Sequence, residues 1–262
     1  MNSYSLPQAI WLSFYSGPMY RAVAQQWRAR SAVYLFLVLV LCWTPGFVMM
    51  HKTLSLAFEG FRARVLPQIP TLAIHKGTIS TPEAKPYVVD WNEAGAHLRV
   101  VIDTTGHYKT LSDADAIVLI TANQAFVRRS AAEIRTYDFL RVKDAVYDQT
   151  RLRGWVDRFE KWTPRLLYPL IFILSFLKRF IQALFIALIG VMIVHAVEAK
   201  LSFSALFTLA IVSMTPSMIL GGALSAADAE FPLQWLLLGL IGFGYFMFAI
   251  NAATETPADD DA

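Results

Sequence analysis

Asp103, Thr104, Thr105 and Gly106 are the residues whose types and spacing come closest to a catalytic motif, and they follow a strand-like apolar run. Aspartic proteases use an Asp-Thr-Gly loop to supply one carboxylate of a pair that shares a proton. Here an additional Thr separates Asp-Thr from Gly, and the chain has no second copy. Phosphotransferases that form an aspartyl-phosphate use a strand-terminal Asp followed by Thr-Gly as the nucleophile, together with a Lys, further acids for Mg²⁺ and a nucleotide.

The same four residues also fit a turn with no chemistry. Asp103 or Thr104 can accept hydrogen bonds from nearby backbone N–H groups, and Gly106 can adopt a positive φ. A turn needs no further partners, so it is the simpler interpretation. Asp103 is therefore retained as a catalytic candidate only under the two enzyme hypotheses, and residues 103–106 are a candidate site for a ligand or partner.

Other catalytic or metal-binding patterns are missing from the sequence. His195 and Glu198 stand three residues apart on a predicted helix, but a metal or proton-relay site would need partners that the apolar segments do not supply. The single cysteine, Cys42, excludes a disulfide framework and a cysteine-based metal centre. We expect no metal and no cofactor. A net charge of +3 without a Lys/Arg cluster also argues against nucleic acid as a partner.

Hydropathy defines the elements that carry these residues. The 262 residues are 56% apolar and only 16% charged, whereas soluble domains have about 25% charged residues. Three runs, 31–50, 201–220 and 231–250, contain no Asp, Glu, Lys or Arg. Each is long enough for a helix across a bilayer, which needs about 20 apolar residues. The sequence therefore predicts a polytopic α-helical membrane protein.

A fourth apolar stretch, 165–197, is interrupted by Lys178 and Arg179. Two cations at the centre of a span are costly, so we place the span near 180–197 and expect both side chains to reach the membrane interface. Residues 166–177 would then lie at the interface or continue the same helix out of the membrane. The chain thus has about four predicted spans.

Lys and Arg residues in the short flanks set the orientation. Arg21, Arg28 and Arg30 precede the first span, Lys200 follows the second, and residues 221–230 contain no Lys or Arg. This pattern predicts that both termini are in the cytoplasm. The block 51–164 would be extracytoplasmic, and the acidic tail 251–262 would be cytoplasmic.

The ends of the first and third spans carry further signals. Residues 1–30 combine aromatic residues with Arg21, Arg28 and Arg30, so we expect a segment that rests on the lipid surface. Pro45 and Pro216 lie inside predicted spans, where each removes a helical hydrogen bond and kinks the helix.

The block 51–164 has the composition of a water-exposed domain, with 16 Lys and Arg and 13 Asp and Glu residues. Residues 53–66 have helical spacing of apolar side chains and are followed by Pro67. The pattern then changes to short β segments in a mostly antiparallel sheet, and helical spacing returns after Phe139. The predicted β segments are 71–75, 78–80, 98–103, 107–111, 116–121, 125–129 and 133–137. We expect an α+β domain.

Five short motifs in this order resemble one protein family. They are Phe14-Tyr15-Ser16 with Tyr20, Trp43-Thr44-Pro45, the segment His75 to Ser80, Val101-Ile102-Asp103-Thr104-Thr105-Gly106, and Thr215-Pro216. The chain resembles uncharacterised bacterial inner-membrane proteins, some of which are labelled maltodextrin-utilisation proteins and which are distantly similar to Yip1-type membrane proteins. The resemblance implies an N-terminal anchor, an extracytoplasmic domain and C-terminal spans. It implies no catalytic residue.

Three functional hypotheses follow. The first is a non-enzymatic accessory or regulatory membrane protein whose outer domain binds a protein, lipid or envelope component, with the lipid bilayer and a protein partner or a second copy of the chain as its partners. The second is a component for the transport of a small solute or lipid through kinked spans. The third is a membrane-bound hydrolase or phosphotransferase that uses Asp103, and it requires an exposed Asp103 in a cleft with other titratable groups.

Overall fold

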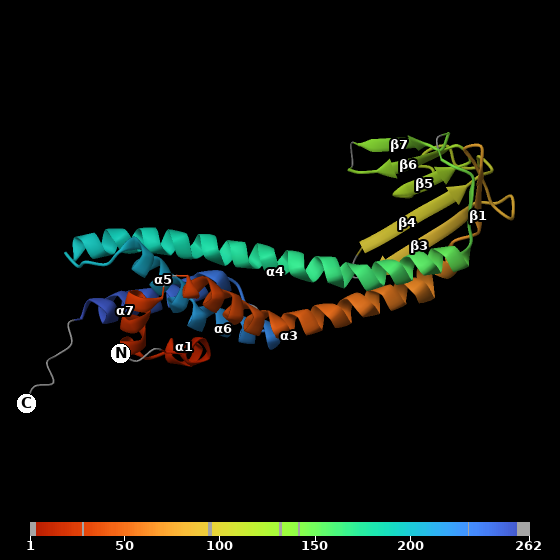
Figure 1. The fold of residues 1–262 in the computed structure, drawn as a ribbon. Helices are drawn as coiled ribbons and strands as arrows, with labels where there is room; N and C mark the ends of the chain where they lie inside the picture. Colours follow the sequence, from red (N-terminus) through yellow and green to blue (C-terminus); the bar gives the residue numbers. More distant parts are fainter. Residues whose placement is uncertain are drawn as a thin grey trace, which may run out of the picture. The chain divides into compact units, whose positions relative to one another are not determined.

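Helices and sheets occupy separate parts of the chain in the computed structural model, which describes residues 4–27, 29–93, 96–130, 133–140, 142–229 and 231–255 (Figure 1). The chain divides into a helical unit, residues 1–50 and 166–262, and an α+β unit, residues 51–165. We call the second unit the outer domain, after the location that the sequence predicts for it. Two long helices, α3 (Arg30–Gly60) and α4 (Gln149–Ala196), contribute to both units.

The helical unit contains four helices that are long and apolar enough to cross a membrane. Besides α3 and α4 it contains α1 (Leu6–Leu12), α2 (Gly17–Gln26), α5 (Phe203–Ser213), α6 (Thr215–Ala226) and α7 (Gln234–Thr254). The α5–α6 segment is mostly buried, whereas the other three candidate spans leave most of their side chains exposed. Exposed apolar side chains are expected where lipid replaces water. The α5–α6 segment is therefore the centre of the helical unit.

The N-terminal segment contributes to this core. Helix α2 packs against α5 and α7, and Met19, Tyr20 and Val23 are completely buried there. Trp11 and Tyr15, by contrast, are exposed. One face of α2 is therefore part of the packed interior of the helical unit.

Helices α3 and α4 are longer than the spans expected from hydropathy. The amphipathic helix expected at 53–66 is not a separate element. It continues from α3 and ends in a π-helical turn, η1 (Phe61–Val65), followed by a 3₁₀ turn, η2 (Leu66–Gln68). Residues 166–177 lie inside α4, which is one continuous helix from Gln149 to Ala196.

Two sheets form the outer domain. A three-stranded antiparallel sheet has the order β2-β1-β8, and a five-stranded sheet has the order β3-β4-β5-β6-β7. The strands are β1 (Leu72–His75), β2 (Thr78–Ser80), β3 (Tyr87–Glu93), β4 (Ala96–Asp103), β5 (Val118–Thr121), β6 (Gln124–Arg128), β7 (Ile134–Asp138) and β8 (Ala145–Tyr147).

The mostly antiparallel character of the larger sheet agrees with the sequence, with one exception. Strands β4 and β5 are parallel, and Val101 is paired with Leu119. The strand predicted at 107–111 is wrong, because these residues belong to the turns and bends of the connection between β4 and β5. Two parallel strands need a long crossover connection between them. The apolar residues of the β4–β5 connection pack on the sheet. Strands β3 and β8 were missed.

Side chains cover both faces of the larger sheet. On one face Val101 and Leu119 pack against Leu111, Ala114 and Ala116 of the β4–β5 connection. On the other face Val89 and Ile102 pack with Val65 of η1, surrounded by partly buried aromatic and aliphatic side chains. The end of β4, where Asp103 stands, is therefore fixed from both sides.

Gly77 and Gly106 provide a test of this domain. Gly77, in the β1–β2 turn, has a φ of 79°, and a Cβ there would lie 2.7 Å from the Leu140 Cα atom. Gly106 has a φ of 80°, but a Cβ there would meet nothing within 4 Å. A left-handed conformation costs an L residue about 1–2 kcal/mol. We expect Gly106→Ala to lower the free energy of unfolding by that amount and Gly77→Ala to lower it by about 1 kcal/mol more, because overpacking is added.

Thermal unfolding of the full chain in mild detergent, followed by circular dichroism, measures both variants. Equal unfolding temperatures for the two alanine variants would contradict the close contact between the β1–β2 turn and the backbone at Leu140.

Candidate functional site

The Asp103 carboxylate lies at the end of β4 and is completely buried. Its Oδ1 atom accepts hydrogen bonds from the backbone N–H of Thr105, at 2.8 Å, and from the Thr105 hydroxyl, at 2.6 Å. Its Oδ2 atom accepts one from the backbone N–H of Tyr108, at 2.7 Å. Burial raises the pKa of Asp103, but the hydrogen bonds from Thr105 and Tyr108 outweigh it and hold the pKa below its ordinary value.

The remaining residues of the predicted motif complete the same turn. Thr104 shares a hydrogen bond with the Thr81 hydroxyl, at 2.9 Å, and Gly106 supplies the positive φ. Both carboxylate oxygens of Asp103 thus bind donors of their own turn, and the group is not accessible to a substrate. A nucleophile or general base needs an accessible carboxylate, so this geometry is that of a structural turn.

Of the Lys and Arg side chains expected at the membrane interface, those that the structure describes lie in different parts of the helical unit and do not form one cluster. The Arg21 Nε atom donates to the Ala252 carbonyl at 3.1 Å, and its guanidinium lies 3.8 Å from Glu255. Arg21 therefore caps the last turn of α7. Arg30 is exposed at the start of α3, and in α4 Lys178 is exposed while Arg179 donates to Gln182.

Two parts of these predictions fall outside the described residues. They are Arg28 and the acidic end of the tail, Asp259, Asp260 and Asp261.

The two prolines lie in different local structures. Pro45 is inside α3, which continues through it, and the preceding Thr44 hydroxyl donates to the Val40 carbonyl at 2.7 Å. Pro216 lies in the first turn of α6, after a break at Met214 that separates α5 from α6. A proline in a first turn costs no helical hydrogen bond. The third predicted span is therefore two helices.

Buried polar side chains gather around this break. The Tyr34 hydroxyl shares a hydrogen bond with the Thr215 hydroxyl, at 2.8 Å, and the Thr208 hydroxyl donates to the Trp27 carbonyl, also at 2.8 Å. Within the described part of the chain, no buried side-chain nitrogen or oxygen lacks a partner. These groups therefore hold the helices together.

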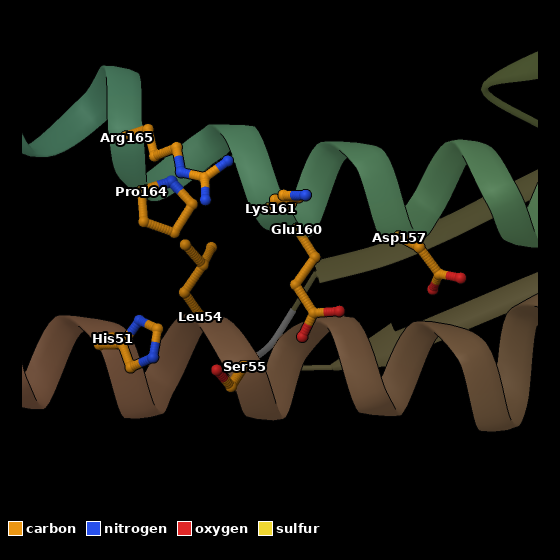
Figure 2. Close-up of a pocket in the computed structure, with 8 residues that line it drawn as sticks. All are labelled: His51, Leu54, Ser55, Asp157, Glu160, Lys161, Pro164 and Arg165. Atoms are coloured by element: carbon orange, nitrogen blue, oxygen red, sulfur yellow. The ribbon is translucent and has the colours of Figure 1, made fainter.

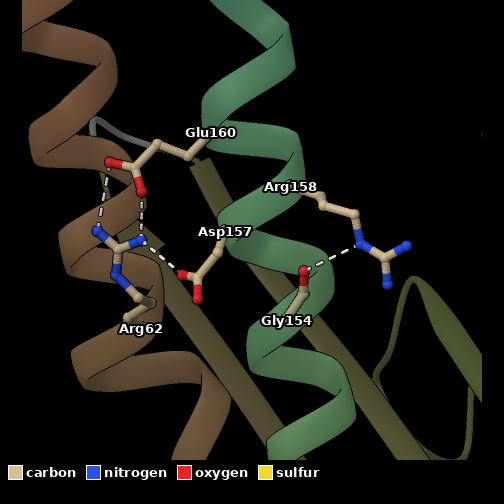
Figure 3. Close-up of polar contacts among 5 residues, drawn as sticks. All are labelled: Arg62, Gly154, Asp157, Arg158 and Glu160. Carbon is tan, nitrogen blue, oxygen red and sulfur yellow. Dashed lines mark hydrogen bonds and ion pairs between the residues drawn. The ribbon is translucent and has the colours of Figure 1, made fainter.

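Sequence reasoning missed a charged contact within the outer domain. Arg62 of η1 donates through both terminal nitrogens to the two carboxylate oxygens of Glu160, and it also donates to Asp157 at 3.2 Å (Figure 3). The hydrogen bond from Arg62 lowers the pKa of Glu160. Glu160 is three positions after Asp157, a spacing that places both side chains on one face of the helix. Nothing in the sequence, however, identifies Arg62 as their partner.

Sequence reasoning also missed the significance of β7, which is an edge strand of the larger sheet. All five of its side chains are exposed, including Ile134 and Tyr137. No described strand pairs with its outer side. An open edge with exposed apolar side chains is a template for another strand.

Among the described residues, no three His, Cys, Asp or Glu side chains lie together in a group that could hold a metal ion. His195 and Glu198 are both exposed near the end of α4, and Glu198 has a φ of 53° beyond the helix.

Substitution of Asp103 tests the turn. Asp103→Asn removes the charge that accepts three hydrogen bonds, so we expect a loss of about 1.5–3 kcal/mol in the free energy of unfolding at pH 7. Because the pKa of Asp103 is lowered in the folded chain, this stabilisation is present above the unfolded pKa of about 3.9 and is lost as the pH falls through the folded pKa. The difference between wild type and variant should therefore shrink below about pH 4.

Asp115→Asn is the matched control. The Asp115 carboxylate lies in the same connection but is exposed, and its distance of 3.6 Å from Arg99 makes a weak ion pair. Its substitution should change the free energy of unfolding by less than about 0.5 kcal/mol. A loss for Asp103→Asn that stays constant to pH 2 would contradict the bonding of the ionised carboxylate.

Comparisons with known proteins identify a family but no activity. No curated protein and no solved structure matches the chain. The family model described as "Protein of unknown function (DUF1189)" matches residues 8–250, which include every helix and sheet described above except the start of α1 and the end of α7. The chain is therefore a member of this uncharacterised family.

Proposed function

We propose that the protein is a non-enzymatic accessory or regulatory membrane protein whose outer domain binds a protein partner. Two observations support this function. The carboxylate with the best catalytic context, Asp103, is buried and bonded to its own turn. The outer domain, in contrast, presents a sheet edge that can accept another strand.

Strand β7 is the observation that carries the proposal. In the ladder with β6, Arg135 lies opposite Val127 and Tyr137 opposite Ala125. The backbone N–H of Phe139 donates to the Asn123 carbonyl, so odd-numbered residues of β7 face β6. Because backbone groups alternate in direction along a strand, those of Ile134, Thr136 and Asp138 point to the open edge.

An extended segment of a partner protein is the occupant that this edge favours. Main-chain hydrogen bonds to the three outward residues would supply affinity, and the exposed Ile134 and Tyr137 side chains would add apolar contacts. Further exposed apolar side chains follow directly, at Leu140 and Val142. Apolar groups gathered on a water-exposed domain are typical of interaction surfaces.

The setting of this domain is part of the same proposal. The lysine and arginine pattern favours both termini in the cytoplasm and the outer domain on the other side. The resemblance to bacterial inner-membrane proteins favours that membrane as the location. The sequence also resembles proteins labelled for maltodextrin utilisation and, distantly, Yip1-type membrane proteins, but this resemblance identifies no ligand.

Thr136→Pro tests the β7 edge. Proline removes the outward N–H of Thr136 and leaves the ladder with β6 intact, as on natural edge strands. Thr136→Val is the matched control, because it changes the same side chain and keeps the N–H. In native purification of the full chain in mild detergent, we expect a stoichiometric partner with wild type and Thr136→Val. Recovery of that partner, quantified by mass spectrometry, should fall about tenfold or more with Thr136→Pro, as expected when binding loses about 1.4 kcal/mol or more.

Equal recovery of the partner with both variants would contradict binding at β7, and recovery of no stoichiometric protein with wild type would contradict the accessory function. The unfolding temperatures of the two variants provide the control for folding.

Cysteine labelling tests the orientation. In a Cys42→Ser background, Lys109→Cys places a thiol at an exposed position of the outer domain, and Tyr15→Cys places one at an exposed position between α1 and α2. A membrane-impermeant maleimide added to intact spheroplasts should label the first variant and not the second. Labelling of only the Tyr15→Cys variant would reverse the orientation.

A further inference from the structure

A pocket of about 440 Å³ lies within the outer domain between the parts of α3 and α4 that belong to it (Figure 2). Its lining combines charged side chains with a few apolar ones. The residues are His51, Leu54, Ser55, Asp157, Glu160, Lys161, Pro164 and Arg165. None of these residues belongs to β7, and the function proposed above does not involve this pocket.

The acidic side chains of this pocket already have a cationic partner. Arg62 binds both oxygens of Glu160 and one oxygen of Asp157. The hydrogen bond from Arg62 lowers the pKa of Glu160, so its carboxylate stays charged and bound to the guanidinium. Arg62 therefore offsets one of the two negative charges of the pocket.

Two cations of the pocket lack such compensation. Lys161 and Arg165 stand one helical turn apart on α4 and are exposed. Within the described ranges neither makes an ion pair with a carboxylate, and the Arg165 guanidinium lies 5.4 Å from the centre of the Trp162 ring. Two neighbouring cations beside a cavity favour an anion. The arginine fork matches the oxygens of a phosphate or a carboxylate, and lysine is a common phosphate ligand.

The residues that flank the pocket in the sequence indicate that the anion is a lipid headgroup. His51 directly follows the uncharged run 31–50, and Arg165 directly precedes the uncharged run 166–177. Beyond Arg165, helix α4 exposes the apolar Leu166 and Leu170. Cations and a tryptophan next to an exposed apolar helix surface are typical of the headgroup layer of a bilayer.

We propose that this pocket binds the phosphate group of a phospholipid headgroup, with Lys161 and Arg165 as its cationic ligands. The Ser55 hydroxyl lines the same pocket and can donate a hydrogen bond to a phosphate oxygen. The acyl chains would continue along the exposed apolar surface of α4. This site does not depend on a protein partner at β7, so either proposal can fail alone.

Lipid titration of the full chain in detergent, followed by native mass spectrometry, tests the site. The probes are phosphatidylglycerol and a diacylglycerol with the same acyl chains but no phosphate. We expect one saturable phosphatidylglycerol adduct on wild type and no saturable adduct with diacylglycerol. The double variant Lys161→Gln, Arg165→Gln should bind phosphatidylglycerol about tenfold more weakly, because two charge-assisted contacts are lost.

The control variant Arg153→Gln, Arg158→Gln removes the same number of charges from the same helix. Neither arginine lines the pocket, and the Arg158 side chain instead donates to the Gly154 carbonyl, on the side of α4 away from Arg62 (Figure 3). Its affinity for phosphatidylglycerol should stay within about twofold of wild type, since only general attraction by surface charge is reduced.

Equal losses in the two double variants would overturn the site, because they would show attraction by net charge alone. Glycerol phosphate distinguishes a lipid from a soluble phosphate ester. Displacement of phosphatidylglycerol by glycerol phosphate at similar concentration would overturn the lipid assignment, and retention of the lipid adduct supports it.

Discussion

The hydrogen bond between the hydroxyl groups of Tyr34 and Thr215 is the contact on which the helical unit depends. Both side chains are buried, and a packed apolar interior offers no water to replace either partner. Thr215 stands at the break between α5 and α6, so the bond fixes α3 to the one interruption in the central segment. Thr208 satisfies the Trp27 carbonyl at the end of α2 in the same way. These two bonds set the register of α2 and α3 with respect to the buried α5–α6 segment.

The contacts between α3 and α4 change from aromatic to charged along the two helices. In the helical unit their contacts are aromatic, with Phe36 against Phe172 and Phe47 stacked on Tyr168. In the outer domain, Arg62 lies in the π-helical turn η1 that continues α3, and its guanidinium binds the carboxylate of Glu160 on α4. Ring contacts need no water, whereas a partly exposed ion pair is tolerable only where water hydrates its remaining groups. The change from rings to charges along the same two helices follows the change from uncharged to charged sequence.

Hydropathy predicted the four long apolar segments, but not the full length of α3 and α4 or the break between α5 and α6. Lys76 and Gly77, between the predicted segments 71–75 and 78–80, form the turn of the β1–β2 hairpin. Both signals are local. The strand predicted at 107–111 failed because Leu111 and its neighbours pack on the sheet from a crossover, and alternation alone cannot distinguish a strand from an apolar connection. The partner of Glu160 could not be predicted, since Arg62 is 98 residues away in the sequence. Asp103 was found from its motif, but only its hydrogen bonds show that the carboxylate is occupied.

The pairing of β1 with β8 joins the first and the last strand of the outer domain, with Ala73 opposite Val146. The chain therefore enters and leaves the sheets at neighbouring points, directly after η2 and directly before α4. Segments whose ends meet in this way can be inserted into, or removed from, a host fold with little change to it. The sheets therefore form an insertion between α3 and α4. The length and sequence of this insertion can differ among proteins while the helical unit keeps its packing.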